Sequence, residues 1–362
     1  KPQLPSRTWE LEERSRVWAE LAPDEAERRV LEGESLLCTG IAGTGKTTYL
    51  QGVVERLRAN GKRVDIISKT HVASNRCGGC TADYWIRRHV LNGASSCDCL
   101  WIDEISQLDV GLWLQLSKLT YTGMQFLLSG DFNQFSPIGN SFRGSMIPEN
   151  AFETSGLLHT LAGGNRLELV ECRRSDAELF DFYSSLISGG SRFELGLADA
   201  VRSAKELLTY DGLAEHNLVI SHQRRIRLNR DLNQQLAPLE AIRLEITGKA
   251  SRGNSAQTML LWPGIVLIGC LAVSKHGIQN GVLYTVESVT REAVMLVGGV
   301  SLSHAHAKTC LRLSYAQTYA SCQGSEFDGP LRLHDTTHKF FTIKHLFVGL
   351  SRAKVASEVG LA

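Results

Sequence analysis

A phosphate-loop pattern at residues 40–47, GIAGTGKT, constrains this chain more than any other feature. It matches G-x-x-x-x-G-K-[ST] in full and stands between an apolar run at 35–39 and a helical apolar pattern at 47–58. Glycines allow successive backbone N–H groups to face phosphate oxygens, and a helix that begins beside them adds a partial positive charge. The pattern therefore predicts a strand, a loop and a helix that together bind a nucleotide. The residues expected to bind it are Gly40, Gly43, Thr44, Gly45, Lys46, Thr47 and Thr48.

Acidic and amide side chains follow the next apolar runs, as the hydrolysis of a bound nucleotide requires. Asp103 and Glu104 end one such run, and Gln134 comes shortly after another. Lys46 is expected to reach the β- and γ-phosphates, while the Thr47 hydroxyl and Asp103 bind Mg²⁺. Glu104 is placed to orient and deprotonate the attacking water, and Gln134 to sense the γ-phosphate. We therefore predict a nucleoside triphosphate hydrolase that uses Mg²⁺.

Short apolar runs alternate with helical stretches, which is typical of a parallel sheet covered by helices on both faces. The alternation occurs twice, and a Gly- and Ser-rich segment with strand-turn-strand signals predicts a small all-β insertion in the second unit. The expected strands lie at 35–39, 64–68, 99–102 and 125–129 in the first unit, and at 167–170, 217–221, 311–316 and 345–349 in the second. The predicted division is a helical lead-in at 1–34, a first core at 35–165, a second core at 166–245 and 310–362, and the β insertion at 246–309.

The composition is that of an ordinary globular protein. Of the 362 residues 43% are hydrophobic, and no apolar run reaches the length that spans a bilayer, so we expect no membrane partner. The 39 basic and 38 acidic residues give a net charge of +1, so any nucleic-acid binding needs a local basic groove. The nine scattered cysteines indicate a reducing compartment, and we expect an intracellular site such as the nucleus or a replication compartment.

Five segments resemble motifs of the superfamily 1 helicases, and they occur in the order of that family. The run GDFNQFSPIG at 130–139 resembles motif III. The other segments are SKTHVA at 68–73 for motif Ia, ECRR at 171–174 for motif IV, TYASCQGSEF at 318–327 for motif V and VGLSRAK at 348–354 for motif VI. The endings of motifs V and VI and the β insertion resemble the RecD and Pif-type branch, which moves 5′→3′.

The resemblance implies an α/β fold with two RecA-like parallel-sheet cores and an SH3-like insertion in the second core. It implies ATP in the cleft between the cores, single-stranded DNA across both, and replication or repair proteins as further partners. Arg173 and Arg352 would act as arginine fingers, with Arg174 as the alternative to Arg173, and Glu326 would contact the ribose. The residues implied to contact the strand are Thr70, His71, Thr81, Tyr84, Thr318 and Gln323. The chain departs from the family at Asp83, where a histidine is usual, and at Ala320 and Ser321, which replace a histidine and a lysine.

Three groups of residues have a second interpretation. Tyr84 and Trp85 either stack on bases or pack in the core, and the basic run at 222–230 faces either solvent or DNA. Four cysteines in a CxxC and a CxC pair either bind zinc or remain free thiols, and we prefer free thiols because CxC is not the usual zinc spacing. They are Cys77, Cys80, Cys97 and Cys99.

Two other functions fit the same motifs. One is a superfamily 1 RNA helicase of viral type, which matched DNA and RNA forks distinguish. The other is a weakly catalytic nucleic-acid-binding scaffold of a replication protein. The intact Lys46, Asp103, Glu104 and Arg352 argue against the scaffold.

Overall fold

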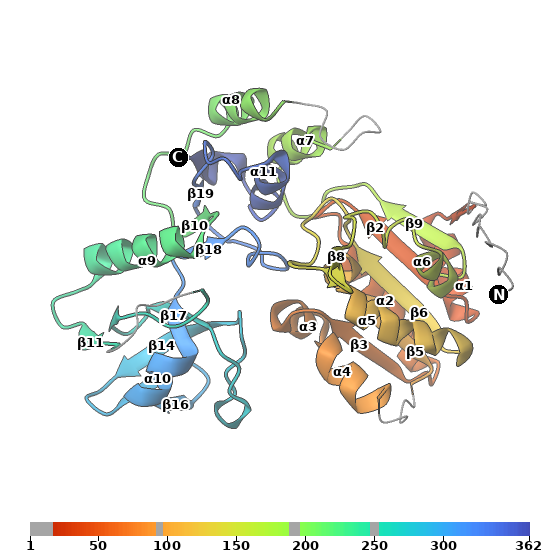
Figure 1. Cartoon of the computed structure of the whole chain (residues 1–362), viewed down its shortest axis with the longest axis horizontal. Coiled ribbons are helices and arrows are strands. Elements are labelled where there is room, and N and C mark those ends of the chain that lie inside the picture. The colour runs from red at the N-terminus through yellow and green to blue at the C-terminus, as the bar shows by residue number, and fades with distance from the viewer. Residues whose placement is uncertain (1–16, 92–96, 188–195, 247–252) are drawn as a thin grey trace, which may run out of the picture.

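The computed structural model describes residues 17–91, 97–187, 196–246 and 253–362. Two lobes, each built on a parallel sheet, lie side by side, and a smaller antiparallel sheet is attached to the second lobe (Figure 1). These are the two RecA-like cores that the sequence predicted, with an insertion in the second. That arrangement brings the loops at the ends of both parallel sheets to the interface between the lobes.

The first core has a seven-stranded sheet in which every neighbouring pair is parallel. Its two central strands, β6 and β5, are buried along their whole length because helices cover both faces. In sheet order the strands are β1 (Ala19–Glu20), β9 (Asn165–Leu169), β2 (Leu36–Gly40), β6 (Gln125–Gly130), β5 (Cys99–Asp103), β3 (Val64–Ser68) and β4 (Cys80–Thr81). The helices are α1 (Pro23–Leu31), α2 (Lys46–Ala59), α3 (His71–Cys77), α4 (Ala82–His89), α5 (Val110–Leu116) and α6 (Gly156–Leu161), with 3-10 turns η1 (Ile105–Gln107) and η2 (Ser117–Tyr121) and a hairpin of β7 (Ser141–Phe142) and β8 (Ser145–Met146).

Alternate residues of each strand in this sheet pack on opposite faces, as the two-residue period of a strand requires. Trp101 packs with α1 and α2, whereas its neighbours Leu100 and Ile102 pack with α4, α5 and α6. Both faces are therefore apolar, and the polar groups of the strands are concentrated at their carboxyl ends, where Asp103 stands.

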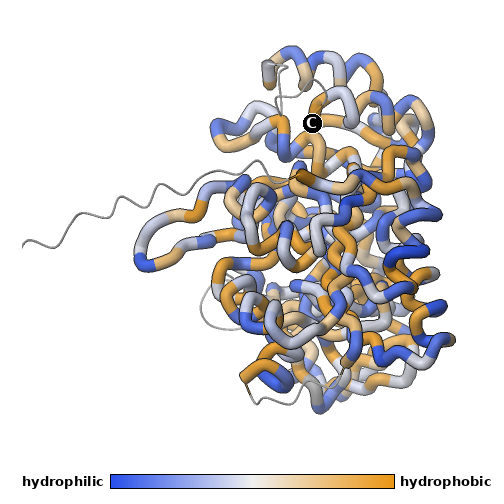
Figure 2. Tube along the Cα trace, turned by 90° about the vertical axis from the view of Figure 1, so that its right-hand side faces the viewer, coloured by the Kyte–Doolittle hydropathy of each residue, from blue (hydrophilic) through white to orange (hydrophobic). Residues whose placement is uncertain are grey.

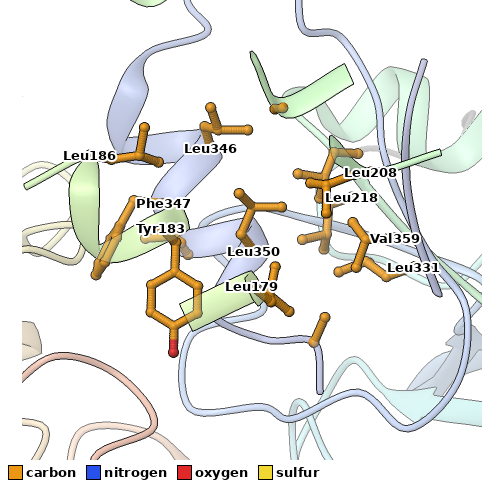
Figure 3. Close-up of a cluster of buried hydrophobic side chains, with 14 of the residues drawn as sticks. Leu179, Tyr183, Leu186, Leu208, Leu218, Leu331, Leu346, Phe347, Leu350 and Val359 are labelled. Carbon is orange, nitrogen blue, oxygen red and sulfur yellow. The ribbon is translucent and has the colours of Figure 1, made fainter. Parts of the chain in front are cut away.

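The second core has a four-stranded parallel sheet covered by helices. Tyr183 of α7 and Phe347 of α11 pack edge to face, and leucines from the helices and strands fill the space around them (Figure 3). In sheet order the strands are β18 (Ala316–Thr318), β10 (His216–Val219), β19 (Leu331–Leu333) and β20 (Val359–Leu361). The helices are α7 (Ala177–Ser185), α8 (Leu197–Leu207), α9 (His222–Leu236) and α11 (Ile343–Leu350), with the 3-10 turn η4 (Ala356–Glu358).

The insertion is a five-stranded antiparallel sheet with its own apolar core. It is not all-β as predicted, because α10 (His304–Cys310) packs against it. The sheet consists of β16 (Val300–Ser303), β15 (Ala293–Leu296), β14 (Leu283–Val289), β13 (Val266–Gly269) and β17 (Leu311–Leu313), and a separate pair is formed by β11 (Ile242–Leu244) and β12 (Met259–Leu261), with the 3-10 turn η3 (Ser274–His276) between β13 and β14. An SH3-like form for this insertion stays a prediction.

Four predicted assignments are wrong. The run at 167–170 is part of β9, which joins the first sheet beside β2 instead of the second. Residues 345–349 lie in helix α11, and the run at 311–316 is divided between β17 of the insertion and β18 of the second core. The lead-in at 1–34 is not separate, since β1 and α1 belong to the first core; its residues 1–16 lie outside the described part.

Hydrophobic segments are spread through both halves of the molecule (Figure 2). Among the described residues, none of the helices has both the length and the apolar composition needed to cross a membrane.

Candidate active site and strand path

The phosphate loop joins β2 to α2, as predicted, and two of its glycines are required by its path. Gly40 has φ 147°, and a Cβ there would lie 2.3 Å from the carbonyl oxygen of Leu169. Gly45 has φ 84° and caps α2 in a left-handed conformation that side chains rarely adopt. Lys46 Nζ donates to the carbonyl oxygens of Gly40 at 2.7 Å and Ile41 at 3.0 Å. The ammonium group is therefore held over the loop where phosphates would bind.

The residues expected to bind Mg²⁺ lie together at the carboxyl end of β5. Thr47 Oγ1 lies 3.5 Å from Asp103 Oδ2, and Ser129 Oγ donates to Asp103 Oδ1 at 2.6 Å. The thiol of Cys77 contacts Asp103 Oδ2 at 3.0 Å. A hydroxyl and a carboxylate oxygen are the hard ligands that Mg²⁺ prefers, so these residues fit the ion.

Two side chains in the same place keep buried polar atoms without a partner among the described residues. Glu104 is 8% exposed, has φ 54°, and leaves Oε2 unpaired. Gln134 is 3% exposed; its Nε2 donates to Asp131 Oδ2 at 3.4 Å while its Oε1 is unpaired. Strained backbone and unsatisfied buried groups cluster at functional sites, where a ligand or water completes them.

Asp131 was not among the predicted site residues, yet it connects two motifs. Its Oδ2 accepts a hydrogen bond from the backbone N–H of Ala42 at 3.0 Å, and its Oδ1 accepts one from Asn133. The loop that carries Gln134 is thereby fixed to the phosphate loop. Its position just after the expected strand at 125–129 was the available signal.

The second core closes one side of a cavity of about 400 Å³ above the phosphate loop. Arg352 is 1% exposed and donates from Nη2 to Ser351 Oγ at 2.9 Å, and burial lowers its pKa. Arg173 donates its backbone N–H to Gly43 O at 2.8 Å, while its side chain is largely exposed and pairs with Glu171. The predicted residues that line the cavity are Gly43, Gly45, Lys46, Thr47, Thr48, Asp103, Glu104, Gln134, Arg173, Glu326 and Arg352.

Two predicted nucleotide-binding residues are not brought to this cavity. Gly40 lines a separate hollow on the other side of the loop, and the Thr44 hydroxyl donates to Ile41 O at 2.8 Å. Their contribution is to the shape of the loop.

Two further arginines, Arg174 and Arg76, line the cavity. The motif comparison gave Arg174 only as the alternative to Arg173 and did not name Arg76. Arg174 donates to Ser351 O at 2.9 Å and to Glu326 Oε1. Although burial opposes the change, the guanidinium of Arg174 lowers the pKa of Glu326. Arg76, from α3, was missed because nothing in its local sequence connects it with Asp103.

Two of the predicted strand contacts, Thr70 and Gln323, lie in loops, whereas Thr318 ends strand β18. The Thr70 hydroxyl accepts a hydrogen bond from the backbone N–H of Ala73 and so caps α3. A Cβ placed on Gly324 would lie 3.8 Å from the same hydroxyl. Thr318 is buried and bonds Ser321, and Gln323 donates to Phe135 O at 3.2 Å across the interface. His71 is the first residue of α3.

The aromatic pair and the basic run have separate outcomes. Trp85 is 2% exposed and donates to Asp65, so it packs in the core, whereas Tyr84 is 54% exposed beside Thr81 and Asp83 at the start of α4. In the basic run at 222–230, which forms the first part of α9, Arg225 is fully buried.

The four cysteines considered for zinc lie in different surroundings. Cys77 faces Asp103, Cys97 lies 4.0 Å from the Met124 sulfur, and Cys99 is buried in β5. Among the described residues no group of three or more His, Cys, Asp or Glu side chains is arranged to hold a metal ion.

Known proteins similar to the chain share both its motifs and its fold. The AAA domain family matches residues 24–160. The ATP-dependent DNA helicase PIF1 of Rattus norvegicus is 24% identical over 385 residues, covering 90% of this chain and 58% of that protein. The crystal structure of Pif1 helicase from Candida albicans covers 94% of both chains with a TM-score of 0.67 and 19% identity. The chain is similar in sequence to the PIF1 helicases and shares the Pif1 fold.

Other Pif1-type proteins are also similar to the chain, one in fold and one in sequence. Bacteroides Pif1 bound to ssDNA has a TM-score of 0.65 at 17% identity and covers 94% of this chain and 92% of that one. The ATP-dependent DNA helicase PIF3 of Trypanosoma brucei brucei is 30% identical over 154 residues, which are 36% of this chain and 19% of that protein. The chain thus spans under a fifth of the length of this relative.

Proposed function

We propose that this Pif1-type chain hydrolyses ATP to move along single-stranded DNA in the 5′→3′ direction and to unwind duplex ahead of it. The observation that carries the proposal is the cavity above the phosphate loop, which residues of both cores line. Because residues of both cores line the cavity, its shape changes when the cores approach each other. Hydrolysis of ATP in the cavity is thereby coupled to movement of one core relative to the other. A nucleus or a replication compartment is the proposed location.

Each core contributes a different part of the chemistry. The Lys46 ammonium group leaves the loop carbonyl oxygens and donates to the phosphates instead. Glu104 orients and deprotonates the attacking water. Mg²⁺, when bound by Thr47 and Asp103, neutralises charge on the phosphate oxygens. Arg352 supplies a further positive charge from the second core, which is effective only when the cleft is closed.

The strand is proposed to cross the interface near Thr70 and Gly324. These two residues belong to different cores and lie next to each other, so closure of the cleft changes their spacing along a bound strand. Bacteroides Pif1 bound to ssDNA, which shares the fold, supports the binding of a single strand by this chain. Because the strand is expected to be bound mainly through its phosphates, its binding should tolerate different base sequences and weaken as the salt concentration rises.

Directional unwinding of tailed duplexes tests the proposal. Duplexes with only a 5′ or only a 3′ single-stranded tail, in DNA and in RNA, are mixed with protein, ATP and Mg²⁺, and Lys46→Ala is the control for ATP-driven opening. We expect opening of the 5′-tailed DNA alone. Preferential opening of the 3′-tailed duplex would reverse the polarity, preference for the RNA fork would make the chain an RNA helicase, and absence of strand-stimulated ATP turnover would leave a binding scaffold.

A further inference from the structure

Arg76, in the last turn of α3, places its guanidinium among the residues expected to hold the metal and the attacking water. Its Nη2 lies 3.4 Å from each of three oxygens, Thr47 Oγ1, Asp103 Oδ2 and Glu104 Oε1. Burial opposes this charge, but the carboxylates of Glu104 and Asp103 raise the pKa of Arg76 overall. The guanidinium thus faces the acidic pair and offsets its negative charge.

The same guanidinium also reaches the second core. Arg76 Nη1 lies 3.4 Å from the carbonyl oxygen of Gly324 and 3.8 Å from Glu326 Oε1. Arg174 binds the same Glu326 oxygen, so that this carboxylate has an arginine from each side of the cleft. Arg76 is therefore poised between acceptors in both cores.

Arg76 and a divalent cation would compete for the same oxygens. Mg²⁺ binds oxygen at about 2.0–2.1 Å, so an ion on Asp103 Oδ2 would place a second positive charge close to the guanidinium, which lies 3.4 Å from that oxygen. We propose that Arg76 is a positioning residue: it competes with the divalent cation for Asp103 and, once displaced, holds the second core through Glu326. The inference rests on the proposed function, because that function is what brings Mg²⁺ and ATP to this site.

Helix α3 gives this exchange a mechanical connection to the rest of the molecule. Thr70, which caps the helix, and His71, its first residue, are predicted strand contacts, and Arg76 lies in the last turn of the same helix. Asn75 donates to Gln279 of the insertion. A shift of Arg76 toward the second core therefore moves the helix that is expected to touch both the strand and the insertion.

Binding of Mn²⁺ to the nucleotide-free chain, measured by electron paramagnetic resonance, tests the proposal without any turnover. Arg76→Met removes the competing charge and should bind Mn²⁺ roughly tenfold more tightly than the parent protein. Should that variant not fold, Arg76→Gln keeps hydrogen-bond donors and carries the same expectation. Adding Asp103→Asn to either variant should remove the gain, which assigns it to this site.

The matched control is Arg56→Met, which removes an exposed arginine of α2 that pairs with Glu27. Its Mn²⁺ affinity should equal that of the parent protein. Unchanged or weaker Mn²⁺ binding in both Arg76 variants overturns the proposal and makes Arg76 an ordinary structural ion pair. A parent protein without ATP turnover would refute the proposed function but would leave this binding comparison valid.

Discussion

Two arginines are buried side by side between the second core and the insertion. Arg225 of α9 is 0% exposed and Arg312 of β17 is 1% exposed. Neither forms an ion pair among the described residues; Arg225 donates to Gly253 O at 2.8 Å, and three of the guanidinium nitrogens have no partner there. Burial, and then the charge of Arg225, lowers the pKa of Arg312 to about 9. The chain thus keeps two like charges where unpaired charge is costly.

Replacing Arg312 with methionine should stabilise the protein. The change removes a desolvated charge and its repulsion with Arg225, and it loses only a hydrogen bond of 3.5 Å to Leu313 O. Replacement of buried charges by apolar side chains of similar volume gains about 1–4 kcal/mol in other proteins. We therefore expect Arg312→Met to increase the free energy of unfolding by about 2 kcal/mol, which raises the melting temperature by a few degrees.

The sign of the pH dependence follows from the lowered pKa. Below about pH 9 Arg312 is charged in both the folded and the unfolded state, so the full cost of burial is present. Above that pH the folded state loses the proton while the unfolded state keeps it, so stability should rise with pH. The advantage of Arg312→Met should therefore be constant near neutral pH and shrink at alkaline pH.

Differential scanning fluorimetry at about pH 7.5 and pH 10 measures both effects. Arg243→Met removes an exposed arginine near the same insertion and serves as the control, with no change expected. A melting temperature for Arg312→Met at or below that of the parent protein at neutral pH would refute the reasoning. It would mean that the guanidinium is stabilised by partners outside those described.

Four further variants test the site and the second core. Lys46→Ala should abolish ATP turnover yet leave nucleotide-free binding of single strands intact, because the phosphate loop does not touch the strand; equal ATPase rates would contradict this. Arg352→Ala should bind nucleotide within about tenfold of the parent protein but lose about 10³-fold in strand-stimulated turnover, and Arg352→Lys should fail nearly as badly because an ammonium lacks the planar fork. Near-normal stimulated ATPase would exclude the two-core mechanism. Burial lowers the pKa of His334 from the usual histidine value of 6.5 to about 4, so stability should fall as pH drops from 6.5 toward 4. His334→Gln should remove roughly 2 kcal/mol of that loss between about pH 7 and pH 5 in urea titrations, and an unchanged slope would contradict it.

The first core was predictable because its signals are local. Its central strands are short apolar runs that end in the residues of the site, so that Asp103 and Gln134 mark the edge of the sheet. Thr47 follows a loop whose glycines are required by its path. Each of these positions depends on neighbours within a few residues, which a sequence pattern records.

The second core was harder to predict because similar apolar runs occupy different structures there. Residues 346–350 of α11 are all buried, and so short a continuous apolar run is also typical of a buried strand. The strand β9 follows the last loop of the first core and returns to its sheet, and nothing in its own residues says which sheet it joins. These assignments depend on contacts between distant segments.

The same distinction applies to the site. The cavity needs residues separated by much of the chain, and an arrangement such as that of Arg76 with Glu326 has no fixed spacing. The motif comparison found Glu326 because its neighbours share the family pattern, and it passed over Arg76 because its function depends only on where α3 ends. Residues that transmit closure between cores act through such contacts. The sequence therefore predicts the chemistry of each core well, whereas the coupling between them is visible only when both cores are seen together.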